Sequence, residues 1–412
     1  MRLLVLCNIV PYPPYGGVHL RVFNVLKRIA GRHEVTLGCH SWSDEDQEGA
    51  SWLTRNGIRT VTGRLTAANW RHAAPALGSA IFAGRPPELV QYQTPELHAL
   101  IAQEHFDVLQ VEETILTPYA ASLPKGADTK KVLVFHNVHF VQAKRIARIE
   151  TMRGLQVWRD ANAAMMRRYE PAIAAEFDRV VAVSDVDRSI LLDVAPQLTI
   201  DVLPNGVDTK ALRPLPEPTS RRSLVFVGTL NYRPCGDAVL WLTREVLPKL
   251  RQRFADIDLW IVGKEPPPEV EALASEGVYV TGRVEDVAPY YERATVAVVP
   301  LRAGGGSRLK ILEAMALGRP VVSTSVGAEG LEVTHGHDIL LADDAESFAA
   351  AIMQLIDQKE TWRTIAGNAR RFVEERHDWD RITEKQLEIY DELLQGKSGQ
   401  APERGRLSRL PA

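Results

Sequence analysis

The sequence predicts an α/β protein made of two Rossmann-like domains that face each other across a central cleft. Short apolar segments alternate with amphipathic helical patterns along the chain, as in folds with parallel sheets. The alternation stops at residues 210–222, where three prolines and many polar groups predict a linker, and then starts again. Each half opens with a strand, a turn with polar, glycine or proline residues, and an amphipathic helix, so the halves share one plan.

The expected elements follow from runs of apolar residues and from helical periodicity. Strands are expected at residues 3–8, 34–39, 107–111, 131–135, 179–183 and 199–203, and after the linker at 223–227, 258–262, 278–281, 296–299 and 320–324. Helices are expected at 17–30, at 141–176 with breaks near Gly154 and Pro171, at 237–254, and after residue 343 as a pair followed by 379–394. We therefore expect domains at 1–209 and 210–378, a last helix within 379–395, and a disordered tail at 396–412.

The composition is that of an ordinary soluble chain, with 412 residues of which 45% are hydrophobic and 25% charged. Lysine and arginine number 49 against 52 aspartates and glutamates, so a net charge of −3 gives no sign of a nucleic-acid partner. Cys7, Cys39 and Cys235 are widely separated, which predicts buried thiols in a reducing compartment. No apolar run reaches the roughly 18 residues of a spanning helix, so we expect a cytoplasmic protein with at most peripheral contact to the inner face of a membrane.

The most informative segment is 304–316, with the sequence GGGSRLKILEAMA. Glycines let backbone amides approach a ligand, and the N-terminus of a helix favours phosphate. Arg308 can fork onto phosphate oxygens, Lys310 can add a point charge, and Glu313 shares a helix face with Lys310 and can accept hydrogen bonds from ribose hydroxyls. The segment predicts a nucleoside diphosphate site, for which the alternative is an ordinary exposed helix start. The predicted binding residues in it are Gly305, Gly306, Ser307, Arg308, Leu309, Lys310 and Glu313.

Other residues are expected beside this segment because they also follow predicted strands. The pair Gly16-Gly17 comes shortly after the first strand, and His136 directly follows the strand at 131–135. The carboxyl ends of parallel strands form the ligand-binding edge of such sheets, so these positions are expected at one cleft. The glycine pair would let the N-terminal loop approach donor phosphates, with a simple turn as the alternative.

Segments in order along the chain resemble the GT-B glycosyltransferases, specifically glycosyltransferase family four. They are Gly16-Gly17, 134–138 (VFHNV), 181–184 (VAVS), 203–208 (LPNGVD), 225–230 (VFVGTL), 304–316 and 318–322 (GRPVV). The resemblance covers about residues 1–395 and implies the GT-B fold, with the last helix crossing back onto the N-terminal domain. It also implies a transferase that uses a nucleoside diphosphate-sugar donor, generally retains the anomeric configuration, and needs no bound metal or other cofactor.

The sequence departs from the family pattern at the donor site. The family carries two glutamates separated by seven residues; Glu313 matches the second, which usually holds the ribose, and Gly305 stands at the first. Many relatives place Arg and Lys on the turn after the strand at 223–227, whereas here Thr229 stands at the Arg position and Arg233 is an approximate stand-in for the Lys. We infer that the cationic contacts moved to Arg308 and Lys310, where they would stabilise the departing diphosphate.

Two histidines are candidates for the chemistry. The resemblance implies that His136 contacts the transferred sugar, and the alternative is a satisfied histidine that bonds neighbouring backbone. His19 lies where inverting GT-B enzymes have a general base, a role that suits an imidazole near neutral pH. We therefore assign catalytic roles to His136, Arg308 and Lys310, and keep an inverting enzyme with His19 as base as the alternative.

A basic amphipathic stretch at 140–169 holds seven lysines and arginines against two acids. It can rest on anionic lipid or receive an anionic acceptor, and the alternative, slightly favoured, is a solvated helix with its apolar stripe in the core. The expected acceptor is a cell-envelope or exopolysaccharide glycan, a lipid-linked molecule or a small molecule. Alternatives to the transferase are a nucleotide-sugar epimerase of the same fold and a catalytically silent protein that binds sugar nucleotides.

Overall fold

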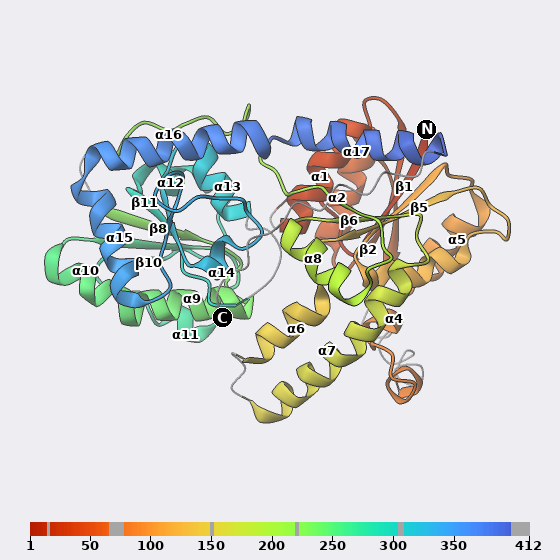
Figure 1. Cartoon of the computed structure of the whole chain (residues 1–412), viewed down its shortest axis with the longest axis horizontal. Helices are drawn as coiled ribbons and strands as arrows, with labels where there is room; N and C mark the ends of the chain where they lie inside the picture. The colour runs from red at the N-terminus through yellow and green to blue at the C-terminus, as the bar shows by residue number, and fades with distance from the viewer. Residues whose placement is uncertain (15–16, 66–77, 149–151, 219–221, 304–308, 397–412) are drawn as a thin grey trace.

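The computed structural model describes residues 1–14, 17–65, 78–148, 152–218, 222–303 and 309–396. In these residues two parallel sheets, each flanked by helices, lie one after the other along the long axis of the molecule (Figure 1). The strand order is β3-β2-β1-β4-β5-β6-β7 in the first sheet and β10-β9-β8-β11-β12-β13 in the second. Both orders start from a central strand and grow to either side, as in doubly wound folds, so the prediction of two Rossmann-like halves is confirmed.

The strands agree with the expected ones in all but two cases. Those of the first sheet are β1 (Arg2–Cys7), β2 (Glu34–Ser41), β3 (Arg59–Arg64), β4 (Val108–Glu112), β5 (Lys130–Phe135), β6 (Arg179–Ala182) and β7 (Ile200–Val202). Those of the second sheet are β8 (Ser223–Val227), β9 (Asp258–Val262), β10 (Val278–Val280), β11 (Val296–Val299), β12 (Val321–Ser323) and β13 (Leu340–Leu341). The strands β3 and β13 were not predicted; each lies at the edge of its sheet, where a long apolar run is not needed.

The helices of the first half cover both faces of its sheet. They are α1 (Gly17–Ile29), α2 (Asp44–Arg55), α4 (Glu88–Gln91), α5 (Pro95–Gln103), the 3₁₀-helix η1 (Thr114–Ser122), α6 (His139–Arg148), α7 (Arg153–Ala174) and α8 (Asp185–Val194). The pattern at 141–176 thus forms two helices that separate between Arg148 and Arg153. Helix α7 passes through Pro171 and ends at Ala174, so the expected break at this proline is not seen.

The second half carries the remaining helices. They are α9 (Arg233–Trp241), the π-helical turn η2 (Leu242–Val246), α10 (Leu247–Arg253), α11 (Pro268–Glu271), α12 (Ala288–Arg293), α13 (Leu309–Ala316), α14 (Ser325–Ala328), α15 (Ala345–Asp357), α16 (Lys359–Arg376) and α17 (Trp379–Leu394). The helix expected at 237–254 begins earlier, at Arg233, because Pro234 fits the first turn of a helix, where its missing N–H is not needed.

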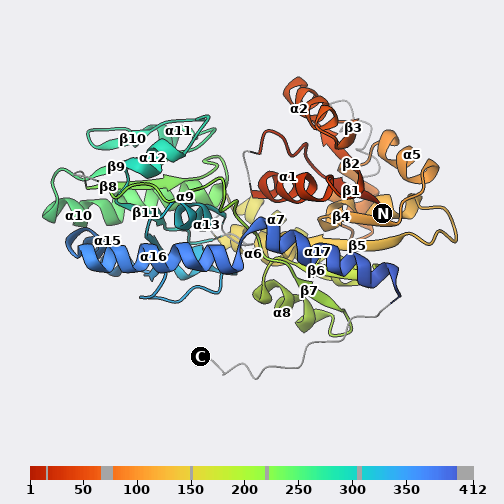
Figure 2. The same cartoon turned by 90° about the horizontal axis from the view of Figure 1, so that it is seen from above.

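Helix α17 leaves the second half and lies on the first. Figure 2 shows α16 and α17 nearly in line across both halves. The side chains of Trp379 and Ile382 pack into the core that contains β1 and α1. The backbone of Gly206 lies so close to both that an added Cβ would come within 2.8 Å of the Trp379 ring and 2.7 Å of the Ile382 Cδ1 atom. Arg28 on α1 fixes the start of α17 through an ion pair with Asp380, at 2.5 Å.

Candidate active site

The first described turn of α13 places Lys310 against the turn that follows β8. The Lys310 Nζ atom lies 3.5 Å from Cys235 Sγ and 4.6 Å from the centroid of the Phe226 ring. A Cβ added to Gly228 would come within 2.7 Å of Nζ, so the absence of a side chain at residue 228 makes room for the amine. The geometry therefore brings a cation to the carboxyl end of the central strand of the second sheet, where ligands bind in such folds.

Glu313 lies one turn after Lys310 and is partly buried. The Tyr291 hydroxyl donates a hydrogen bond to Glu313 Oε2 at 3.3 Å. Burial raises the pKa of the Glu313 carboxyl to about 7, although the Tyr291 hydrogen bond and the charge of Lys310 favour ionisation. Ligand hydroxyls that donate to this carboxylate would stabilise its charged form.

Gly17 and Leu309 join the two halves at this point. Gly17 begins α1 in the first half, and a Cβ added there would lie 3.7 Å from Leu309 Cδ1 at the start of α13. The Leu309 side chain packs against the hydrophobic cores of both halves. The starts of α1 and α13 thus lie together, as the sequence predicts. The predicted site residues Gly16, Gly305, Gly306, Ser307 and Arg308 lie outside the described residues.

His19 lies two residues further along α1, and Lys264 acts on it from the other half. Burial, and then the charge of Lys264, lower the pKa of His19 to about 4. The imidazole is therefore neutral at pH 7, the form that can accept a proton.

Arg233 is the first residue of α9, and its guanidinium faces α11. The Arg233 Nη1 atom lies 3.4 Å from Glu269 Oε1. The side chain is about one-third exposed, so the ion pair with Glu269 is solvated and weak.

His136 follows β5 as expected, but its imidazole is buried. Only 5% of the residue is exposed, and its Nε2 atom lies 2.7 Å from Oε2 of the buried Glu112 at the end of β4. Burial favours a higher pKa for Glu112, but the contacts with His136 and the charge of Arg21 hold that pKa below its usual value. The ring is therefore almost fully enclosed and faces a carboxylate, whereas the alternative expected bonds to neighbouring backbone.

Behind His136, a buried polar network continues to α17. Gln110 Nε2 donates to Glu112 Oε1 at 2.6 Å, and the Tyr390 hydroxyl donates to Gln110 Oε1 at 2.5 Å. Gln386 Nε2 donates to the same oxygen of Gln110 at 2.8 Å. The sequence reasoning missed Glu112, although an acidic residue at the end of an apolar strand is a signal that could have found it.

A second acid–histidine pair anchors α6. Glu170 on α7 is fully buried and accepts hydrogen bonds from the backbone N–H groups of His139 and Phe140, both at 3.2 Å. His139 Nδ1 lies 2.9 Å from Glu170 Oε1. Burial lowers the pKa of His139, but the hydrogen bond and charge of Glu170 outweigh it and raise the value to about 9. The charged pair thus fixes the start of α6.

Glu113, next to Glu112, has a left-handed backbone. Its φ of 87° is one that a residue with a side chain adopts only under constraint, and such strain collects at functional sites. It stands at the carboxyl end of β4, and its charge contributes to the raised pKa of Tyr92 and of His139. Glu113 is therefore a candidate for the acceptor side of the cleft that the sequence reasoning missed.

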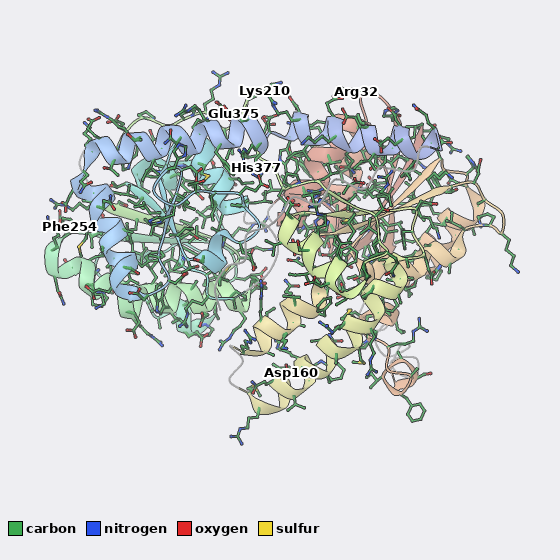
Figure 3. All side chains as sticks on the ribbon, viewed as in Figure 1. Arg32, Asp160, Lys210, Phe254, Glu375 and His377 are labelled. Atoms are coloured by element: carbon green, nitrogen blue, oxygen red, sulfur yellow. The ribbon has the colours of Figure 1, made fainter. Side chains whose placement is uncertain are left out.

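The halves also meet away from this site. A groove of about 310 Å³ lies between them, bordered by the ends of β6 and β7 and by the junction of α16 and α17. His377, labelled at that junction in Figure 3, donates a hydrogen bond from Nδ1 to the Asn205 carbonyl of the first half at 2.7 Å. Within the described residues, no group of three or more His, Cys, Asp or Glu side chains could hold a metal ion, and no helix could span a bilayer.

Two family descriptions match the chain. Residues 15–211 match "Glycosyltransferase Family 4", and residues 221–358 match "Glycosyl transferases group 1". With the two facing Rossmann-like halves, this defines a glycosyltransferase of the GT-B fold. The chain belongs to glycosyltransferase family four.

Known proteins similar to this chain agree with that class. A phosphatidyl-myo-inositol mannosyltransferase of Mycolicibacterium smegmatis is 25% identical over 302 residues, which are 71% of this chain and 72% of that protein. A D-inositol 3-phosphate glycosyltransferase of Acidothermus cellulolyticus is 30% identical over 268 residues, 57% of this chain and 58% of that protein. This second alignment, like one with a phosphatidyl-myo-inositol mannosyltransferase of Mycobacterium leprae that spans 58% of that protein, covers less than two thirds of the relative.

Solved structures share the fold over nearly the whole chain. Sucrose-phosphate synthase of Thermosynechococcus elongatus has a TM-score of 0.74 at 18% identity and covers 96% of this chain and 100% of its own. HepE of Anabaena, solved with UDP and glucose, has a TM-score of 0.68 at 17% identity and covers 95% of this chain and 99% of its own. At these identities the likeness shows the fold alone.

Proposed function

We propose that the protein transfers a sugar from a nucleoside diphosphate-sugar donor to an acceptor hydroxyl, with retention of anomeric configuration and without a bound metal. The observation that carries the proposal is the position of the Lys310 amine beside Gly228, at the end of β8. When the bond between the sugar and the diphosphate breaks, negative charge develops on the departing phosphate oxygens. A fixed cation in a water-poor site stabilises that charge more in the transition state than in the ground state.

In this proposal, Glu313 binds the ribose of the nucleotide. A nucleoside presents two neighbouring ribose hydroxyls, and a carboxylate can accept a hydrogen bond from each. Lys310 and Glu313 are three residues apart on α13, so one helix face presents a cation and an anion side by side. That order of charges fits a diphosphate followed by a ribose. Arg308 precedes Lys310 in the sequence, and we propose it as a second cation for the diphosphate.

The acceptor binds on the first half in this proposal. Gly17 lets the start of α1 approach the donor, and Glu113 stands at the carboxyl end of β4 with a constrained backbone. The proposed acceptors are a cell-envelope or exopolysaccharide glycan, a lipid-linked molecule or a small molecule. The names of the relatives above make D-inositol 3-phosphate and phosphatidylinositol the first acceptors to test.

The test is turnover of donors by the purified full chain. UDP- and GDP-linked hexoses are each incubated with D-inositol 3-phosphate, with phosphatidylinositol, or with water as the acceptor. We expect release of the nucleoside diphosphate, and a product whose anomeric coupling constant in NMR equals that of the donor. An inverted product would contradict retention. Conversion of the donor sugar without release of the nucleotide would identify an epimerase, and tight nucleotide binding without any turnover would identify a silent binding protein.

A further inference from the structure

The helices α6 and α7 form a hairpin that projects from the first half. Figure 1 shows both helices extending away from the sheets, on the side opposite α16 and α17. Asp160, in the first half of α7, lies near the outer end of the hairpin (Figure 3). The base is anchored by the pair of Glu170 and His139, so the hairpin is held firmly at one end. We call its other end, residues 144–148 and 152–158, the tip.

The tip exposes an unusual amount of apolar side chain. Of the ten large hydrophobic side chains exposed in the described part of the chain, four lie within residues 152–158: Met152 at 67%, Leu155 at 37%, Val157 at 68% and Trp158 at 39%. The alternative of an apolar stripe packed in the core is therefore wrong for these residues. A cluster of exposed apolar side chains, as opposed to scattered ones, marks a surface that another body covers.

Exposed cations flank this apolar cluster along the chain. Lys144, Arg148 and Arg153 are all exposed, and none makes an ion pair with a described residue. Residues 140–169 carry seven basic and two acidic side chains, so the hairpin is strongly positive although the whole chain has a net charge of −3. The partner must therefore offer both an apolar layer and negative charge.

We propose that the tip of the α6–α7 hairpin docks on the surface of an anionic phospholipid bilayer. A bilayer interface accepts tryptophan and aliphatic side chains at the level of the headgroups, and anionic headgroups attract the surrounding lysines and arginines. A second copy of this chain fits less well, because two positive tips repel each other. The charge complementarity selects the anionic membrane, and this binding goes beyond the proposed function because it needs no catalysis.

The position of the hairpin gives the docking a consequence for the cleft. Arg145 on α6 pairs with Glu329 of the second half, and Gln142 on α6 donates to the Tyr232 hydroxyl there at 3.2 Å. The hairpin thus borders the junction between the halves. A bilayer bound at the tip would lie close to this junction, where it can present an acceptor anchored in lipid.

Flotation of the full chain with vesicles tests the proposal. We expect wild type to float with vesicles of phosphatidylcholine and phosphatidylglycerol at low salt, and to float far less with vesicles of phosphatidylcholine alone. It should also float far less in 0.5 M salt, where the screening length between charges is less than roughly one nanometre. The triple variant Lys144→Glu, Arg148→Glu and Arg153→Glu should bind anionic vesicles at least about tenfold more weakly.

The matched control is the triple variant Arg55→Glu, Arg244→Glu and Lys385→Glu, which makes the same change of charge at exposed sites on α2, η2 and α17, outside the hairpin. It should bind as wild type does. A second pair separates the apolar contribution: Val157→Ser with Trp158→Ser should weaken flotation, whereas Val186→Ser with Leu394→Ser, which are 40% and 42% exposed, should not.

Three results would overturn the proposal. The first is equal flotation of the tip variants and their controls, and the second is equal flotation of wild type on anionic and neutral vesicles. The third is a dimer in sedimentation velocity that the tip variants dissociate and the controls do not, since the occupant would then be a second copy. Thermal melting and binding of a nucleoside diphosphate by each variant show that the fold and donor site are intact.

Discussion

At the scale of single residues, Glu313 has the most revealing environment. Its carboxyl shares a partly buried space with the Tyr291 hydroxyl, and burial raises its pKa to about 7. A group held in this way makes the folded protein less stable when it ionises. Natural sequences keep such a cost at functional sites, where a ligand later stabilises the charge.

The change Glu313→Gln tests this environment through the pH dependence of stability. The folded pKa of about 7 lies above the ordinary value of 4.5, so the native state binds more protons between these two pH values. Stability from Glu313 is therefore complete below about pH 4.5, falls as the pH rises to 7, and is constant above that. The free energy of unfolding of the variant should equal that of wild type at pH 4.5 and exceed it by about 1–3 kcal/mol at pH 8, as measured by chemical denaturation.

The same difference in stability between the variant and wild type at both pH values would show that the pKa of Glu313 is not raised. The variant should also lose nucleotide affinity at pH 8, because the amide presents one acceptor oxygen in place of a carboxylate.

The histidines His136 and His19 differ in their contacts. His136 lies within 2.7 Å of Glu112, whereas His19 faces Lys264 as a neutral imidazole. If His136 acts on the sugar, His136→Ala should lower kcat by roughly 10²-fold or more and leave the affinity for a free nucleoside diphosphate nearly unchanged. His19→Ala should reduce kcat only slightly.

His136→Gln gives a control for a purely structural role, since glutamine can keep the contact with Glu112. Full recovery of kcat in His136→Gln would mean that the histidine only holds Glu112. An inactive His19→Ala variant that accompanies an inverted product would make His19 the general base.

At the scale of elements, α17 shows how a distant segment completes the first half. Gly206 lies against α17 with contacts that a Cβ would bring below 3 Å, including the His377 carbonyl at 2.9 Å. Such contacts force the helix or the loop to shift, as in an overpacked core.

The change Gly206→Ala should therefore destabilise the protein by about 1–3 kcal/mol, measured as the free energy of unfolding in urea. Gly367→Ala is the matched control, because Gly367 lies within α16 with open space around its Cα. There the same substitution should stabilise by about 0.5–1 kcal/mol, since alanine is the better helix former. Similar effects of the two substitutions would show that α17 does not press on Gly206.

The elements that the sequence predicted are those that carry a long apolar signal. Strands β8, β9 and β11 have the predicted bounds, because each is a run of four or five residues in the middle of a sheet. The strand β3 has the sequence RTVTGR, in which polar and apolar residues alternate at an exposed edge. No apolar run therefore predicts it. The network from His136 through Glu112 to Tyr390 could not be predicted, since it joins residues 136, 112 and 390 only through the fold.

At the scale of the whole molecule, two halves meet at the starts of α1 and α13. Leu309 packs on both cores, Arg145 pairs with Glu329, and Arg283 pairs with Glu45 at 2.8 Å. The order of motifs along the chain predicted that the starts of these two helices face one cleft. It could not predict that the Lys310 amine occupies the space left by Gly228, because that contact depends on the packing of α13 against β8.

Calorimetry on the full chain measures whether Lys310 binds the diphosphate of the donor. A panel of nucleoside diphosphates, with UDP first, is titrated into wild type, Lys310→Ala and the control Lys249→Ala, whose partly exposed lysine pairs with Glu346 on the outer surface. We predict that Lys310→Ala lowers the affinity for the diphosphate by at least about tenfold, the effect of one charged hydrogen bond. The affinity for the parent nucleoside should barely change. Equal affinity of wild type and Lys310→Ala for the diphosphate would show that Lys310 does not bind it.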